Sequence, residues 1–371
     1  MRLVLHREIP DDNVLARQWN ELVYHMECPE VFYTYEWALA VSRAYRESVK
    51  PLLILAYEQD SLVGVAALAA DKAQTSFLTG TTADYCDFVS APELRQEFIT
   101  AVLAELRRWG APKLALANLP ADSATTPALQ LCANPRGYNL FSRPAFQCLQ
   151  VSLRTAEERD SVRQSVRHKR ERRYLKALAA KVPVAVDHLR SSELIASALP
   201  SFSRAHVARL SAIGRLSHLD SPQRIRFLAE VGELLSPHGW VTLSQLRAGD
   251  RAIAWLYAFR FARHWSFYQM TFDCSFGEYS PGSGLRLKVI EEACDSSETD
   301  FVDLGLGGEH HKQRWATATR QTIDVTLARS AVTYVRVAAR YHVAAAIKTS
   351  PRLESYVRRV LGRPSNGIAQ S

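Results

Sequence analysis

A short glycine-containing segment, Tyr279-Ser280-Pro281-Gly282-Ser283-Gly284-Leu285, has the residue types of an anion site. It lies between a predicted strand and a predicted helix, and its two glycines would let backbone N–H groups approach a ligand closely. The N-terminus of the helix adds partial positive charge, and Pro281 suits the first helical turn. The segment therefore favours an anionic ligand. The alternative is a plain turn capped by a serine, because glycine-rich turns are common.

The elements that would position this segment belong to a pattern that occurs twice. Hydrophobic periodicity predicts strand, strand, strand, helix and strand in that order. The first copy covers residues 52–57, 62–70, 76–79, 92–109 and 112–116, and the second covers 241–246, 253–261, 265–272, 282–294 and 301–306. Asp60 and Asp250 fall in equivalent turns, and Asp84 and Asp273 at equivalent strand ends. Agreement of five elements in order predicts a duplication.

The length of 371 residues, with 47% hydrophobic and 23% charged residues, predicts a folded protein with more than one core. We expect two domains and two helical segments. Their ranges are an N-terminal domain at 1–153, a basic helical linker at 154–180, a C-terminal domain at 181–332 and a basic helical tail at 333–371.

The cysteine pattern and the apolar runs exclude several classes of protein. The six cysteines form no C-x-x-C pair and have no histidine at zinc-ligand spacing, so we expect neither disulfides nor a metal site. The N-terminus lacks the apolar core of a signal peptide, and no apolar run approaches the roughly 18 residues of a spanning helix. We expect a cytoplasmic protein, either soluble or peripherally bound at the inner face of the membrane.

The net charge of +8 suits an anionic ligand or surface. Much of this charge lies in one predicted helix, at Arg163, Arg167, His168, Lys169, Arg170, Arg172, Arg173 and Lys176. Because no DNA- or RNA-binding signature accompanies this run, nucleic acid is not the expected partner. A solvated linker helix is the favoured interpretation, and binding to an anionic ligand or membrane surface is the alternative.

Several motifs together resemble a known family. They are Phe32-Tyr33-Thr34-Tyr35-Glu36-Trp37, Asp84-Tyr85-Cys86-Asp87, Phe272-Asp273, Glu278-Tyr279-Ser280-Pro281-Gly282, Phe301-Val302-Asp303-Leu304-Gly305, Glu309-His310-His311-Lys312 and Trp315. The chain resembles, over residues 15–335, the CelD-type (cellulose-biosynthesis) acetyltransferases of the GNAT superfamily, which are related to the Fem-type peptidoglycan aminoacyltransferases. This implies an α/β (α+β) architecture of tandem GNAT-like folds, each with a mixed, mostly antiparallel sheet flanked by helices.

The resemblance implies acyl transfer from acetyl-CoA or another acyl-CoA in the second half. The acceptor would be an amine or hydroxyl of a cell-envelope or exopolysaccharide precursor. Two sets of residues would bind the donor: Ser280, Gly282, Ser283, Gly284 and Leu285 at the pyrophosphate, and the backbone of Gln269 and Met270 at the thioester carbonyl. Tyr279 departs from the family pattern Gln/Arg-x-x-Gly-x-Gly/Ala, and Arg286 or Lys288 would then supply the missing charge.

The same resemblance suggests catalytic roles. Asp273, at the end of the fourth strand of its half, is the first candidate for the general base, and the alternative is a turn-capping carboxylate. Tyr268 and Tyr279 could protonate the departing thiolate or could simply be packing residues. Lys312 could contact the acyl carbonyl or an acidic acceptor, and otherwise would be a solvated lysine.

Residues of the first half are candidates for the acceptor site. That half lacks a Gly-x-Gly loop, so we expect it to bind no CoA. Asp84 and Asp87, together with Trp37 and Glu309, could hold a cationic or polyhydroxylated acceptor, although turn-capping is the alternative for the two aspartates.

Two further functions stay open. One is a non-catalytic accessory protein that keeps the fold and binds a glycan or a biosynthetic partner, which Tyr279 favours. The other is a Fem-like transferase that uses aminoacyl-tRNA, which the basic segment 154–180 would suit.

Overall fold

The computed structural model describes residues 1–165 and 168–349, and Arg167 and the tail beyond Thr349 lie outside the described residues. The first half contains β1 (Arg2–His6), α1 (Asn13–Tyr24), α2 (Tyr35–Ala44), β2 (Pro51–Glu58), β3 (Ser61–Ala70), β4 (Thr75–Phe77), β5 (Val89–Ser90), α3 (Arg95–Arg108), β6 (Lys113–Pro120), α4 (Thr125–Cys132) and β7 (Asn139–Ser152). The remainder contains α5 (Ala156–Gln164), α6 (Lys169–Ala179), β8 (Val184–Leu189), α7 (Ser192–Ser211), α8 (Pro222–Leu235), β9 (Val241–Ala248), β10 (Arg251–Phe261), β11 (His264–Phe272), α9 (Pro281–Asp295), β12 (Phe301–Leu306), α10 (His310–Gln313), β13 (Ala318–Ala328) and α11 (Ala331–Thr349).

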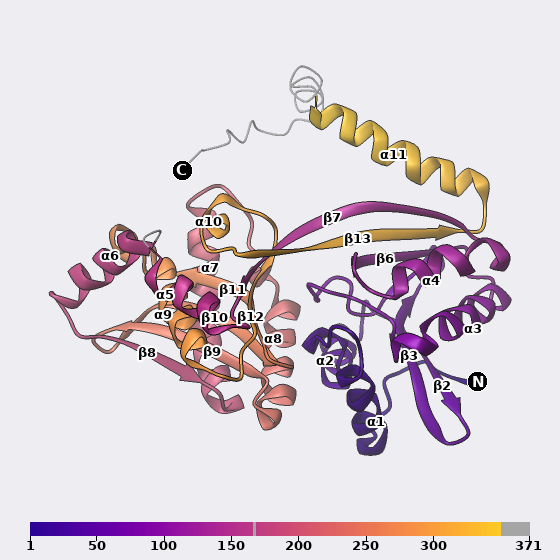
Figure 1. The fold of residues 1–371 in the computed structure, drawn as a ribbon, viewed down its shortest axis with the longest axis horizontal. Helices are drawn as coiled ribbons and strands as arrows, with labels where there is room; N and C mark the ends of the chain where they lie inside the picture. Colours follow the sequence, from indigo (N-terminus) through magenta and orange to yellow (C-terminus); the bar gives the residue numbers. More distant parts are fainter. Residues whose placement is uncertain (166–167, 350–371) are drawn as a thin grey trace.

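The strands join in one mixed, mostly antiparallel sheet, flanked by helices (Figure 1). Its order is β1-β2-β3-β4-β6-β13-β7-β12-β11-β10-β9-β8, with β5 paired to β3. The predicted duplication is confirmed, since β2-β3-β4-α3-β6 in the first half corresponds to β9-β10-β11-α9-β12 in the second. In each half the helix connects the two parallel strands, β4 and β6 or β11 and β12. This order agrees with a crossover connection, which parallel strands require.

The two halves exchange their last strands. β7 follows the first half in sequence but pairs with β12, whereas β13 follows β12 and pairs with β6. β7 and β13 also pair with each other and form the long ribbon that spans both halves in Figure 1. The exchange binds the halves to each other through backbone hydrogen bonds, in addition to the packing of α2 against α8.

Two predicted details differ in the structure. Asp84 does not end a strand, because β4 already ends at Phe77 and Asp84 lies in the loop before β5. The basic segment is two helices, α5 and α6, and both contact α9. Arg163 pairs with Asp295 at 2.6 Å and Arg172 with Glu291 at 3.3 Å, so part of this charge serves the contact with α9. Among the described helices, none is long and apolar enough to cross a bilayer.

Candidate functional site

A cavity of about 600 Å³ lies where β11 and β12 separate. The parallel pairing of the two strands ends at Ser266 and Asp303, and beyond this point both strands line the cavity. Helices α7 and α9, the loop after α7, the residues around α10 and the first-half loop at Asp84 supply the other walls. The separation therefore leaves a stretch of β11 backbone beside a space, instead of beside a neighbouring strand.

The cavity wall includes the beginning of α9. Ser280 adopts a left-handed backbone conformation, with φ of 46°, just before the helix starts at Pro281, and Ser283 lines the cavity. The first N–H groups of a helix have no acceptor within the helix, and the helix dipole makes this end attractive to an anion. The glycine-containing segment lies between β11 and α9, as predicted, and of its residues Ser283 lines the cavity. A bound anion remains a prediction.

Arg286, one turn further along α9, is buried yet lines the cavity. Its Nε has no hydrogen-bond partner among the described residues, and its Nη2 donates only a long bond, 3.5 Å, to Met270 Sδ. Burial lowers the pKa of Arg286 to about 10, while the charge of Glu309 acts in the opposite direction. Because a buried guanidinium without an ion-pair partner is costly, and no ion pair of Arg286 is seen among the described residues, Arg286 is suited to an anionic ligand.

Asp84 reaches the same cavity from the first half. Burial raises the pKa of Asp84 to about 8, and the nearby carboxyl of Asp303 adds to this, although Lys312 and Arg224 oppose it. Asp303 is itself held by Tyr85 Oη at 2.6 Å, Gln150 Nε2 at 2.8 Å and the backbone N–H of Gly305 at 2.7 Å. A carboxyl that ionises near neutral pH beside a cavity is the usual arrangement of a proton acceptor.

Lys312 and Glu309 border the cavity on the β12 side. Lys312 Nζ donates to the carbonyl oxygen of Leu306 at 2.6 Å and pairs with Glu309 at 2.9 Å. The lysine therefore fixes the chain that follows β12 and keeps a cation in the cavity wall. Its predicted contact with an acyl group or acceptor stays a prediction.

Tyr268, Gln269 and Met270 also line the cavity, as residues of the β11 stretch that β12 does not cover. The hydroxyl of Tyr268 donates to the carbonyl oxygen of Thr82 at 2.5 Å and accepts a hydrogen bond from Arg224. Burial raises the pKa of Tyr268, although the charge of Arg224 acts against this. Tyr268 therefore connects the two halves at the cavity wall.

Two predicted catalytic residues lie outside this cavity wall. Asp273 accepts hydrogen bonds from the backbone N–H and the hydroxyl of Ser275, at 2.9 Å and 2.7 Å, and forms an ion pair with Arg251. This is the turn-capping arrangement that was the alternative for this residue. Partial burial raises the pKa of Asp273, but the hydrogen bonds from Ser275 and the charge of Arg251 outweigh it and hold this pKa below its ordinary value. Tyr279 accepts a hydrogen bond from Lys181.

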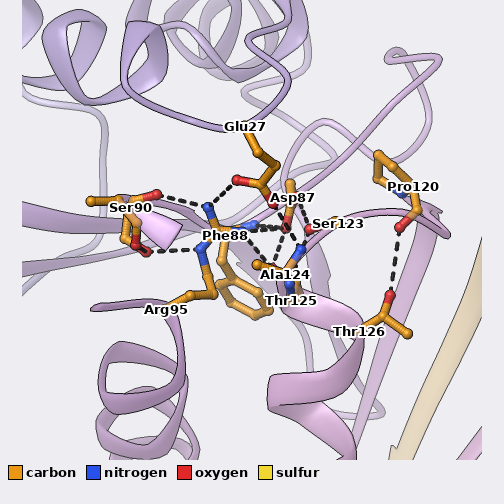
Figure 2. Close-up of polar contacts among 11 residues, drawn as sticks. Glu27, Asp87, Phe88, Ser90, Arg95, Pro120, Ser123, Ala124, Thr125 and Thr126 are labelled. Carbon is orange, nitrogen blue, oxygen red and sulfur yellow. Dashed lines mark hydrogen bonds and ion pairs between the residues drawn. The ribbon is translucent and has the colours of Figure 1, made fainter. Parts of the chain in front are cut away.

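Among the predicted acceptor-binding residues, Asp84 and Glu309 line the cavity, whereas Trp37 and Asp87 do not. Trp37 is fully buried, and its indole N–H donates to Thr82 Oγ1 at 3.2 Å. Figure 2 shows Asp87 in a closed polar network with Ser123, Thr125 and Arg95. Asp87 therefore stabilises the first half, whereas Trp37 packs against Phe227 and Phe259 of the second half, with ring centroids 5.4 Å and 5.0 Å apart.

The two glycines of the anion segment have different surroundings. A Cβ on Gly282 would lie 3.2 Å from the ring of Phe272, beside the cavity. A Cβ on Gly284 would lie 2.7 Å from Leu175 of α6, so this glycine allows the close packing of α6 on α9. Leu285 is buried in the hydrophobic core beneath α9.

Several cavity residues come from parts of the chain without a recognisable motif. They are His206 and Arg209 of α7 and Arg215 and His218 of the loop that follows it. Burial lowers the pKa of His206 to about 4, and the same cause lowers that of His311 to about 4, so both imidazoles are neutral near pH 7. The sequence showed these residues only as parts of a helix and a loop, which does not indicate what they face.

The similarity to known proteins points to the same half of the chain. Residues 161–313, which include β9 to β12 and α9, match the family model described as an acetyltransferase (GNAT) domain. No curated protein sequence matches the chain. The CelD-type subfamily therefore remains a resemblance.

Solved structures share the fold over most of the chain. FemX is 10% identical with a TM-score of 0.65, and the match covers 91% of this chain and 99% of that one. A conserved protein of unknown function from Bacteroides thetaiotaomicron is 8% identical with a TM-score of 0.56, covering 85% and 97%. The C-terminal domain of a putative lysylphosphatidylglycerol synthetase from Agrobacterium fabrum is 12% identical with a TM-score of 0.54, covering 90% and 95%. The predicted tandem GNAT-like α/β architecture is confirmed.

Proposed function

We propose that this protein transfers an acyl group from a CoA thioester to an amine or hydroxyl of a small acceptor, with Asp84 accepting the proton. The observation that supports this most is that two unusual charged groups face one cavity. A carboxyl with a pKa of about 8, Asp84, and a buried arginine with an unpartnered Nε, Arg286, both face the space at the start of α9. The match of residues 161–313 to an acetyltransferase domain supports the same reaction class.

The donor would lie along the gap between β11 and β12. Its phosphates would meet the N-terminus of α9 and the guanidinium of Arg286, which replaces the side chain that the family pattern has at Tyr279. Its thioester would lie beside Gln269 and Met270, in the part of β11 that has no pairing with β12. Backbone N–H groups here could stabilise the oxyanion as it develops.

The acceptor would enter from the Asp84 side. Its nitrogen or oxygen attacks the carbonyl carbon, the new bond forms, and the carbon–sulfur bond breaks. Asp84 takes the proton from the acceptor, directly or through one water, and that proton can then return to the departing thiolate. Because Asp84 belongs to the first half and Arg286 to the second, the proposed site needs both. A glycan or cell-envelope precursor is the acceptor class that the CelD-type resemblance favours.

The test compares Asp84→Asn with Asp273→Asn, the same substitution at the two candidate bases. Release of free thiol from acetyl-CoA is measured with a panel of amino sugars, sugar alcohols and amino acids as acceptors. Asp84→Asn should lower kcat by about 100-fold or more with unchanged CoA affinity, because the amide cannot take the proton. Asp273→Asn should leave kcat within about threefold, since its carboxylate caps a turn. If Asp273→Asn is the variant that loses activity, the base is Asp273. If no acceptor gives thiol release with the wild type, acyl-CoA transfer is wrong, and aminoacyl transfer or the accessory-protein function takes its place.

Aminoacyl transfer is the second candidate. It is favoured by the FemX-like fold, which extends over 91% of the chain, and by the resemblance to the Fem-type aminoacyltransferases. The cavity residues would be the same, because an aminoacyl ester also needs a proton acceptor and an oxyanion donor. Supplying charged tRNA in place of acetyl-CoA, with the same acceptors, separates the two donors.

A further inference from the structure

The C-terminal helix α11 lies along the ribbon of β7 and β13, at the outer edge of the molecule (Figure 1). Its inward face carries Tyr334 and Tyr341, whose rings pack against Phe141 of β7 with centroids 6.4 Å and 5.7 Å apart. Arg143 of β7 also lies 5.7 Å from the ring of Tyr341. These contacts fix which side of the helix points away from the protein.

The outward side of α11 is apolar where a solvent-exposed helix is normally polar. Val332, Val335 and Val343 have exposed fractions of 59%, 59% and 58%, and Ala339 and Ala346 between and beyond them are also exposed. Their spacing of three or four residues places all five on one stripe. Single exposed apolar residues are ordinary, but a row of them along one helix marks an interaction surface.

The charges around this stripe have one sign. Arg336 and Arg340 are exposed next to it, and Arg329 is exposed just before the helix. From residue 325 to residue 349 the sequence contains no Asp or Glu. A second copy of this helix would bring arginines together without a compensating carboxylate, which disfavours self-association through the stripe.

We propose that the outward face of α11 binds an anionic lipid surface. The valines enter the boundary between headgroups and acyl chains, and Arg336 and Arg340 contact lipid phosphates. An apolar stripe flanked by cations is what such binding requires, because burial of apolar area and attraction to anionic lipid add together. The proposal is independent of the proposed reaction, since it uses no residue of the cavity.

Vesicle flotation with the full chain tests this surface. The vesicles are phosphatidylcholine alone, or phosphatidylcholine with about one-third phosphatidylglycerol. Two variants alter the surface: Val332→Ser/Val335→Ser/Val343→Ser removes the stripe, and Arg336→Gln/Arg340→Gln removes the charge. A matched control on α1, Val14→Ser/Arg17→Gln, changes a valine that is 54% exposed and an exposed arginine on another helix.

The wild type and the α1 control should float with anionic vesicles and much less with neutral ones. Each α11 variant should lower the bound-to-free ratio by about tenfold or more. Circular dichroism melting should match the wild type, since the altered side chains are exposed. Equal binding to both vesicle types, or binding that neither α11 variant weakens, would overturn the proposal. A concentration-dependent dimer in sedimentation that the serine variant abolishes would assign the stripe to a second copy instead.

Discussion

The two halves each bury an arginine on the helix between their parallel strands, and they differ in what surrounds it. In the first half, Arg95 of α3 has all its groups engaged: Nε with Ser90 Oγ at 2.8 Å, Nη1 with Thr125 Oγ1 at 2.8 Å and Nη2 with the carbonyl oxygen of Ser90 at 2.7 Å (Figure 2). The carboxylates of Asp87 and Glu27 lie 3.4 Å away. In the second half, Arg286 has one long bond to a sulfur atom and faces a cavity.

This difference indicates how the two copies of a duplicated fold can take different roles, one structural and one suited to ligand binding. The first half fills the region around its arginine with its own side chains, so the charge stabilises the fold. The second half leaves its arginine without a carboxylate partner within ion-pair distance among the described residues, which fits a ligand that supplies the negative charge. Asp84 shows that the first half still contributes, because its loop reaches the cavity of the second.

Removing each buried arginine should change stability strongly in the first half and little in the second. Arg95→Met should lower the free energy of unfolding by about 3–5 kcal/mol, because it leaves the buried Asp87 carboxylate without its cation. Arg286→Met should leave the free energy unchanged or raise it, since it removes a buried charge that has no close partner. Urea unfolding of both variants without ligand measures the contrast. Equal losses in the two variants would mean that Arg286 is structural as well.

The next effect is on the pH profile of the reaction. The pKa of Asp84 is raised to about 8 by burial, and the base must be ionised, so kcat/KM should rise with pH, reach half its maximum near pH 8 and level off above it. Below that value it should fall about tenfold per pH unit, to about a hundredth of the plateau at pH 6. A hydroxyl acceptor is used, because an amine would add its own titration. If the residual activity of Asp84→Asn rises with pH in the same way, the ionisation of another group causes the pH dependence.

The smallest effect concerns Gly305, where β12 leaves β11. Its φ is +77°, and a Cβ there would lie 2.7 Å from the carbonyl oxygen of Phe267. Gly305→Ala should therefore cost about 1–3 kcal/mol of stability and weaken CoA binding by moving one wall of the cavity. Gly110→Ala in the first half is the matched control, since Gly110 has φ of +78° and no atom closer than 4.0 Å. If the two variants lose the same free energy of unfolding, the close approach of residue 305 to the carbonyl oxygen of Phe267 does not exclude a Cβ.

Local sequence was enough to predict the repeated elements, because the apolar residues of 241–246, 253–261 and 282–294 recur with the spacing and run lengths of strands and a helix. The two strands are nevertheless buried on both faces in the structure. The exchange of β7 and β13 could not be predicted, since pairing between strands far apart in sequence leaves no local pattern. The roles of the aspartates depend on the same long-range packing. Asp84, Asp87 and Asp273 all look like turn residues in the sequence, and only the surrounding chain makes one a cavity residue, one a network residue and one a cap.

The proposed CoA site at Arg286 is tested most directly by calorimetry of CoA binding to the wild type and to Arg286→Met. We expect the wild type to bind CoA and the variant to bind it about tenfold to a hundredfold more weakly, because a charge-assisted hydrogen bond to phosphate is lost. Lys288→Met, which alters an exposed cation on the same helix, serves as the control and should bind almost normally. Absence of CoA binding to the wild type, or equal affinity in the wild type and Arg286→Met, would contradict the proposed site.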